Sequence, residues 1–170
     1  MESTEDKLDP IVLETITQTV EIPVNHDNIF VFPEGVPAFE EYRQFVLYCD
    51  TQLQPFFFLK SVGISPEISF VCVDPYLVSS DYKVRLSSAD MKTLGLASKE
   101  DAFVFSAVTV RDNPEEITAN LVGPFVLNLK NCTGKQVINE NGRYSVRTKI
   151  WEKINELKEQ QKEEACLAEA

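Results

Sequence analysis

The sequence has little of what most catalytic and metal sites are built from. Its 170 residues include one histidine, His26, and only six glycines. One histidine cannot supply both imidazoles of a histidine-rich zinc site, no GxSxG motif marks a nucleophile, and six glycines leave little room for a phosphate-binding loop. We therefore expect no enzymatic activity, no metal and no cofactor, and we interpret His26 as a solvated loop residue.

Cysteines and long apolar runs are also scarce. None of the four cysteines, Cys49, Cys72, Cys132 and Cys166, belongs to a CxxC pair. Three lie within or beside apolar runs, which favours buried free thiols over disulfides or metal ligands. No stretch approaches the roughly 20 apolar residues that span a bilayer, and the acidic start lacks the pattern of a secretory signal. These features predict a cytoplasmic protein without a membrane segment.

Basic residues are in deficit, with 16 lysines and arginines against 27 acids and a net charge of −11. Residues 1–14 carry five acids and one lysine, and residues 151–170 carry six acids and three lysines. An acidic surface repels phosphate backbones and anionic lipid, so we expect no direct nucleic-acid or membrane binding, whereas a basic protein would be attracted. The charge is equally consistent with maintaining solubility alone.

What the sequence does contain is a series of short β-branched and aromatic runs separated by turn residues. We predict strands at 15–22, 29–32, 45–49, 56–62, 68–73, 82–86, 102–110, 117–121, 125–129, 136–138 and 144–147. A single helical turn is expected at 39–44 and a turn at 132–135. Ser87 and Ser88 should cap one internal helix, 89–94, that ends at Gly95. The pattern indicates an all-β fold, an antiparallel barrel or sandwich in a single domain.

A different pattern begins near Ile150. Ile150, Trp151, Ile154 and Leu157 share one helical face before the apolar stripe ends in EQQKEEA. This predicts a C-terminal helix that packs at its start and frays at its end. The chain thus divides into an acidic N-terminal extension, residues 1–14, a β domain, residues 15–150, and a helical tail, residues 151–170.

The segment Phe32–Glu40, reading FPEGVPAFE and called the proline turn below, predicts a stiff protruding turn. Pro33 and Pro37 fix φ, and Gly35 can adopt positive φ. Taken alone, the proline turn is more typical of a connector than of a binding loop.

Further along, the run Phe56–Phe58 must place rings on both faces of a strand, so at least one ring needs cover from this chain or from a partner.

A pair of carboxylates acting as acid and base is the remaining catalytic possibility, with Glu34, Asp74 and Asp81 as candidates. Asp74 precedes Pro75 and is more simply explained as a turn former. A hydrolase would need two of these groups within about 5 to 9.5 Å of each other in a cleft.

Six segments resemble, in order and spacing, the FliW family of flagellar assembly factors. They are FPEGVPAFE (32–40), PFFFLKS (55–61), DPY (74–76), NLVGPFVLN (120–128), QVI (136–138) and YSVR (144–147). The resemblance covers Thr15 to about Ile150. The sequence departs from the family pattern at two positions. Ala38 stands where the family commonly has glycine and should stiffen the turn. Lys60 stands where the family commonly has glutamine and adds a charge.

The resemblance implies a small, cytoplasmic, antiparallel β-barrel-like protein without enzymatic activity, which we expect to be a monomer when free. It implies two competing partners: flagellin before export, and CsrA, a basic RNA-binding regulator. Binding of CsrA would prevent that regulator from repressing flagellin translation. An acidic protein fits a basic partner by electrostatic steering.

We hypothesise that the proline turn, the phenylalanine run and the Asn120–Pro124 break border the partner surface. The candidate contact residues are Pro33, Glu34, Gly35, Val36, Pro37, Phe39, Phe57, Lys60, Asp74, Pro75, Tyr76, Asn120 and Pro124. The opposing interpretation is that prolines and asparagines in these motifs only fix turns. A different class of function is a non-enzymatic β-barrel module for a small apolar ligand, which predicts an apolar cavity inside the barrel.

Overall fold

The computed structural model describes residues 12–13, 28–139 and 142–168. Its strands are β1 (Val12–Leu13), β2 (Phe30–Val31), β3 (Gln44–Cys49), β4 (Phe57–Ser61), β5 (Ser69–Val73), β6 (Val84–Arg85), β7 (Ala102–Thr109), β8 (Thr118–Ala119), β9 (Phe125–Asn128), β10 (Thr133–Gln136) and β11 (Thr148–Lys149). Its α-helices are α1 (Pro75–Val78), α2 (Ser88–Leu94) and α3 (Trp151–Ala168). Short 3₁₀ turns cover Thr51–Leu53, Lys99–Asp101 and Pro114–Glu116.

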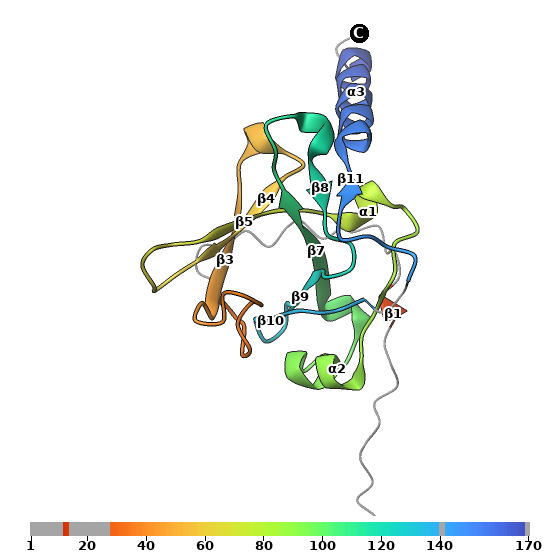
Figure 1. Ribbon diagram of the computed structural model, residues 1–170. Coiled ribbons are helices and arrows are strands. Elements are labelled where there is room, and N and C mark those ends of the chain that lie inside the picture. The colour runs from red at the N-terminus through yellow and green to blue at the C-terminus, as the bar shows by residue number, and fades with distance from the viewer. Residues whose placement is uncertain (1–11, 14–27, 140–141, 169–170) are drawn as a thin grey trace, which may run out of the picture.

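Nine strands form one sheet in the order β11-β8-β7-β5-β4-β3-β2-β10-β9 (Figure 1). The sheet closes on itself because β7 pairs with both β5 and β9. One pairing is parallel, where Thr133 of β10 lies opposite Val31 of β2. The predicted all-β, barrel- or sandwich-like fold is confirmed, with a mixed sheet in place of a purely antiparallel one. β1 and β6 pair separately as a two-stranded ribbon.

The interior of the sheet is filled with aromatic rings. Phe32, Phe45, Phe57, Phe105 and Phe125 are each at most 1% exposed. The centroids of the Phe105 and Phe125 rings lie 5.2 Å apart, and those of Phe32 and Phe45 lie 4.9 Å apart. Side chains alternate along β7, so Val104 faces a second core cluster that contains Tyr82, Leu94 and Ile150.

Three predicted elements near the end of the β domain are wrong, and one of them is the strand 136–138, because β10 ends at Gln136. Residues 144–147 form a loop that ends in a turn and not a strand, and β11 begins only at Thr148. The expected turn at 132–135 is mostly strand β10, because Gly134 serves close packing: a Cβ there would lie 2.5 Å from the ring of Phe32. The predicted strand 15–22 and His26 lie outside the described residues.

The internal helix α2 forms as predicted. Ser87 caps it in a capping box with Asp90, and Gly95 ends it with φ of 64°. A second helix, α1, was not expected; it begins at Pro75 behind the Asp74 cap. The helical turn expected at 39–44 is absent from this described segment, where the chain instead forms turns that end at β3.

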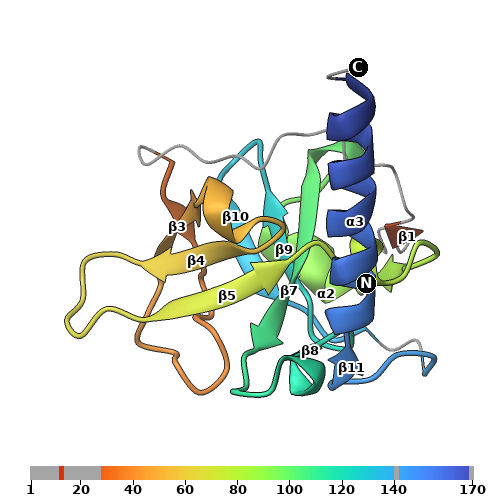
Figure 2. The same cartoon turned by 90° about the horizontal axis from the view of Figure 1, so that it is seen from above.

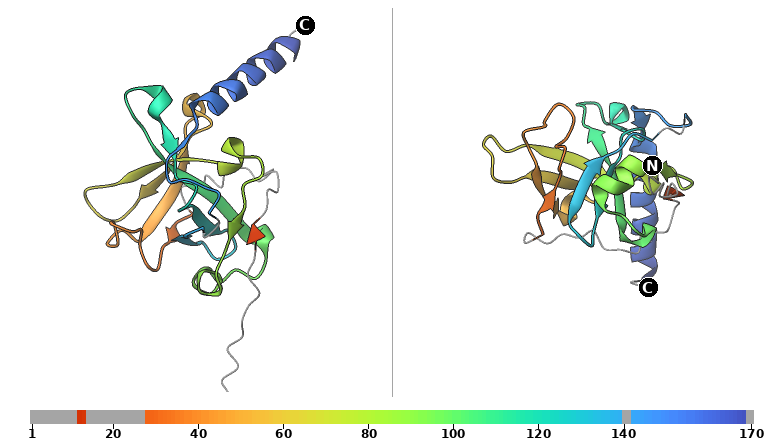
Figure 3. Two further views of the ribbon diagram at one scale, coloured as in Figure 1. Left: turned by 45° about the vertical axis from the view of Figure 1, so that its right-hand side comes forward. Right: turned by 90° about the horizontal axis from the view of Figure 1, so that it is seen from below.

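The C-terminal helix α3 packs only at its start. Ile150 and Ile154 are buried, while the helix continues fully exposed from residue 158 to 167 and projects away from the body (Figures 1 and 3). Viewed from above, β3, β4 and β5 lie on one side of the molecule and α3 on the other (Figure 2). The helix extends to Ala168, and its fraying at that end stays a prediction.

All four cysteines are free thiols, as predicted. Only Cys72 is buried, and burial raises the pKa of its thiol. Cys49 and Cys132 are only half-buried and Cys166 is exposed on α3, so the predicted burial is confirmed for Cys72 alone.

Candidate functional site

The proline turn has a backbone fixed by hydrogen bonds and close packing. The Gly35 amide donates to the Phe32 carbonyl at 2.9 Å, and the Phe39 amide donates to the Val36 carbonyl at 2.7 Å. Gly35 has φ of 68°, and a Cβ there would lie 2.6 Å from Glu40 Cα. Only glycine fits this position, so the turn presents its exposed side chains from a defined base.

One aromatic ring stands out on the exposed side of the proline turn. Phe39 is 39% exposed, and its ring centroid lies 5.6 Å from that of Phe70. Nearby, the Tyr42 hydroxyl donates to the Pro66 carbonyl at 2.7 Å, which ties the chain after the turn to the β4–β5 connection. That connection carries Ile64, also 39% exposed. We call the exposed residues Pro33, Glu34, Pro37, Phe39 and Ile64 the turn surface.

Lys135 links the proline turn to β10 and α2. Its Nζ lies 2.8 Å from Asp90 Oδ1 and 3.3 Å from Glu34 Oε2. Burial alone would lower the pKa of Lys135, but hydrogen bonding and attraction to Asp90, and then to Glu34, raise it overall. Asp90 also closes the α2 capping box. The Lys135 cation therefore connects the proline turn, β10 and the start of α2.

Next to this ion pair lies a surface cleft of about 570 Å³, which we call the α2 cleft. It is lined by Arg85, Leu86, Ser87, Ser88, Asp90, Lys135, Gln136 and Ile138. Ile138 is 72% exposed. Arg85 is exposed and forms no ion pair with any residue that the structure describes.

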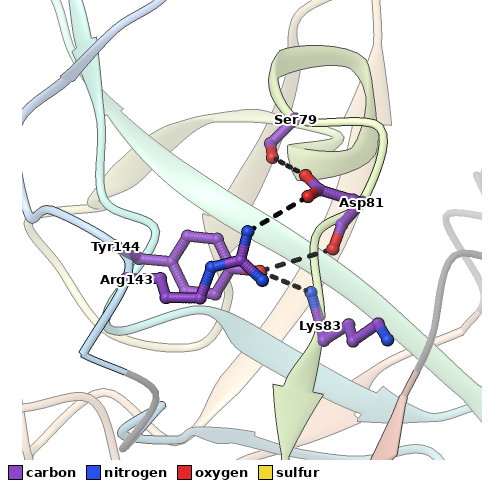
Figure 4. Close-up of polar contacts among 5 residues, drawn as sticks. All are labelled: Ser79, Asp81, Lys83, Arg143 and Tyr144. Carbon is purple, nitrogen blue, oxygen red and sulfur yellow. Dashed lines mark hydrogen bonds and ion pairs between the residues drawn. The ribbon is translucent and has the colours of Figure 1, made fainter.

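A polar junction joins the chain between α1 and β6 to the segment before β11 (Figure 4). The Ser79 hydroxyl donates to Asp81 Oδ1 at 2.8 Å, and Arg143 Nη2 lies 3.3 Å from Asp81 Oδ2. The Lys83 amide donates to the Tyr144 hydroxyl at 3.0 Å, which in turn donates to the Asp81 carbonyl at 3.5 Å. The Ser79 hydrogen bond is the main cause that lowers the pKa of Asp81.

The Asn120–Pro124 segment is held by its own turn and by the core. Asn120 Oδ1 accepts from the amides of Val122 and Gly123, at 3.1 and 2.8 Å. The Tyr82 hydroxyl donates to the Leu121 carbonyl at 2.7 Å, and the Pro124 carbonyl accepts from the Val137 amide at 2.9 Å. These contacts give the segment a structural role within the described chain.

The structure separates the thirteen candidate contact residues by exposure. Five are buried: Gly35, Val36, Phe57, Pro75 and Pro124. Three are half-buried: Asp74, Tyr76 and Asn120. Five are exposed: Pro33, Glu34, Pro37, Phe39 and Lys60. The buried five offer a partner almost no surface here and serve as scaffold, whereas contact through the exposed five stays a prediction.

The phenylalanine run divides between the two faces as predicted. Phe57 points into the aromatic interior, where it is 1% exposed. Phe58 is half-buried on the other face, with its ring centroid 6.1 Å from that of Tyr48, so the chain itself supplies part of its cover. Lys60 follows on that outer face and pairs with Glu67 at 3.2 Å.

The three candidate acid–base groups have separate partners. Glu34 pairs with Lys135, and Asp81 pairs with Arg143. Asp74 Oδ1 accepts from the Tyr76 amide at 2.9 Å as the α1 cap, and burial raises its pKa. Among the residues that the structure describes, no cluster of three or more histidine, cysteine or acidic side chains could hold a metal ion, and no helix is long and apolar enough to cross a membrane.

Sequence reasoning missed Lys135, Asp90 and Arg85, the charged residues around the α2 cleft. They come from three elements, and their charges carry no local spacing signal. Ile138 fell inside the predicted strand 136–138, but its high exposure depends on β10 ending at Gln136.

Comparison with known proteins supplies the family context. The FliW protein family model matches residues 14–150. A flagellar assembly factor FliW from Pseudothermotoga lettingae is 37% identical over 81% of this chain and 88% of its own length. One from Leptospira biflexa is 36% identical over 80% of this chain and 89% of its own length. A crystal structure of the flagellar assembly factor FliW, 30% identical, superposes with a TM-score of 0.67 over 81% of this chain and 96% of that chain.

Proposed function

The chain belongs to the FliW family of flagellar assembly factors, and from this we propose that it binds cytoplasmic flagellin and sequesters the translational repressor CsrA. Flagellin and CsrA compete for it, so a rise in unexported flagellin releases CsrA and reduces flagellin translation. The protein acts in the cytoplasm as a monomer when free. It does so without catalysis and without direct contact to nucleic acid or membrane.

The observation that carries the flagellin-binding part is the exposed ring of Phe39 on the proline turn. An aromatic side chain that is 39% exposed, on a backbone fixed at Gly35 and Val36, is already organised to anchor an apolar partner segment. Little ordering of the turn is then needed on binding. Ile64 is a second exposed apolar side chain, on the β4–β5 connection that the Tyr42 hydroxyl ties to the chain after the turn.

The charge of the protein supports the CsrA part. A net charge of −11 attracts a basic protein and speeds its association with this protein at low salt. We therefore expect the association rate with CsrA to fall as ionic strength rises, while flagellin binding through apolar contacts depends less on salt.

Copurification of flagellin tests the turn surface. Phe39→Ala in the tagged full-length protein should reduce recovered flagellin at least about tenfold, the scale of a lost aromatic anchor. Val110→Ala removes another exposed apolar side chain, 59% exposed and just after β7, and serves as the matched control. Equal recovery with Phe39→Ala and Val110→Ala would contradict the assignment of Phe39.

Competition tests the regulatory part. CsrA bound to the immobilised protein should be displaced as purified flagellin is added, and CsrA-bound RNA should reappear in the supernatant. Simultaneous retention of both partners at saturation would contradict a shared or coupled site. Recovery of neither partner from cells would contradict the proposed function as a whole.

The aromatic interior weighs against the alternative of a barrel that holds a small apolar ligand. The Phe57 and Phe105 rings lie 5.4 Å apart and the Phe32 and Phe125 rings 6.2 Å apart, so side chains occupy the space that such a ligand would need.

A further inference from the structure

The α2 cleft contains an arginine that has no ionic partner among the described residues, on a strongly acidic protein. Arg85 is exposed at the end of β6 and forms no ion pair within the described part of the chain. The other cation of the cleft, Lys135, is already neutralised by Asp90 and Glu34. Beside Arg85 lies the 72% exposed side chain of Ile138. The cleft is therefore suited to a segment that carries both carboxylates and apolar groups.

The register of β1 directs a segment of this chain toward the cleft. Val12 lies opposite Arg85, and Leu13 lies opposite Val84, in an antiparallel pair. Extending that register along β6 toward α2 leads to Leu86 and then to Ser87 and Ser88. These are the residues that line the cleft.

The residues that precede β1 have the complementary chemistry. Residues 1–10 contain one lysine and four carboxylates, at Glu2, Glu5, Asp6 and Asp9. A segment tethered beside its site has an effective concentration on the order of millimolar, which allows weak individual contacts to be occupied. We propose that residues 1–10 bind in the α2 cleft of their own chain, with a carboxylate on the Arg85 guanidinium.

This inference does not rest on the proposed function, because residues 1–10 lie outside the part of the chain that matches the family. Its consequence is that the cleft accepts an acidic partner segment only after the chain's own acidic segment has been displaced.

Arginine-specific modification of the full-length protein by phenylglyoxal, followed by mass spectrometry, tests the proposal. Arg111 is exposed and serves as the internal reference. Arg85 should react at least about threefold more slowly than Arg111 in 0.05 M salt, and the protection should disappear in 1 M salt, where screening acts within about 3 Å. The variant Glu5→Gln/Asp6→Asn/Asp9→Asn should react at Arg85 as fast as at Arg111.

A matched control removes the same charge elsewhere. Glu159→Gln/Glu163→Gln/Glu164→Gln on the exposed part of α3 should leave the protection of Arg85 intact. The same Arg85 rate in the native protein and in the N-terminal variant would overturn the proposal. Protection that decreases on tenfold dilution would also overturn it, since the segment would then come from a second copy. Circular dichroism confirms that each variant is folded.

Discussion

Lys135 Nζ lies 2.8 Å from Asp90 Oδ1, and the two side chains are only 17% and 12% exposed. A shielded ion pair of this kind sits between the proline turn, β10 and the start of α2. The ion pair thereby fixes the position of the turn surface relative to the α2 cleft.

We predict that Lys135→Met destabilises the protein by about 1 to 3 kcal/mol, because the Asp90 carboxylate is left shielded without its cation. The expected loss is below that of a fully buried pair, since Glu34 reaches solvent. Urea unfolding followed by circular dichroism measures it. Lys60→Met removes an exposed pair to Glu67 and should cost less than about 1 kcal/mol, so equal losses would contradict the role of Lys135.

The pH dependence of this pair has a defined sign. The folded-state pKa of Lys135 is raised, so its contribution to stability is complete below the ordinary lysine value of about 10.4 and is lost as pH rises through the folded pKa. The stability difference between native protein and Lys135→Met should therefore shrink in alkaline solution. A difference that grows between pH 8 and pH 11 would contradict this assignment.

Ala38 carries a positive φ of 72°, which is costly for any residue with a Cβ. Ala38→Gly should relieve that strain and stabilise the protein by up to about 1 kcal/mol, after the larger chain entropy of glycine is counted. Gly35→Ala is the opposite case, because its Cβ would meet the Glu40 backbone, and it should cost about 2 kcal/mol or more. Thermal unfolding measures the stability of both variants. A higher unfolding temperature for Ala38→Gly indicates strain at Ala38, whereas a lower one indicates that Ala38 stiffens the turn without strain.

Asp74 serves as the α1 cap, and burial raises its pKa, so the ionised form is disfavoured in the folded state. Asp74→Asn keeps the cap and should be at least as stable as the native protein at pH 7, with the gain vanishing below about pH 4 as the aspartate itself becomes protonated. Asp74→Ala should lose about 1 kcal/mol. Urea unfolding at both pH values measures this. A loss of partner binding in a stable Asp74→Asn variant would instead indicate contact by Asp74.

The pKa of Asp81 is lowered first by the Ser79 hydroxyl, then by a hydrogen bond from its own backbone, and after these by the charge and the hydrogen bond of Arg143. Ser79→Ala should therefore raise this pKa more than Arg143→Gln does. Carboxyl-carbon NMR across an acid titration resolves the two effects. A larger rise in Arg143→Gln would show that the ion pair, and not the hydrogen bond, governs the junction.

The sequence predicted those elements whose signals are local. Ser87 and Gly95 bracket α2 because caps act within one turn of the helix, and the β4–β5 hairpin follows from two apolar runs around a turn. The order of family segments also predicted the fold class correctly. In contrast, β11 pairs with β8 across about thirty residues, which no local pattern specifies.

The candidate site was predicted less completely, for a physical reason. Alternation along β4 predicts that Phe57 faces away from Phe56 and Phe58, but not which face becomes the interior. Phe57 was therefore proposed as a contact although it is a core residue. The contact between Lys135 and Asp90 joins residues about 45 positions apart, and a single sequence carries no sign of it.

The closed sheet has a consequence for how the chain reaches its native state. The parallel contact of Val31 with Thr133 joins residues about 100 positions apart, and the chain must complete it before β10 can bridge β2 and β9. Contacts this distant in sequence slow folding, because the entropy of loop closure is lost before the pairing is gained. On the ribosome, the strands from β2 to β5 emerge long before β10 and hold an unpaired edge at β2 throughout that interval.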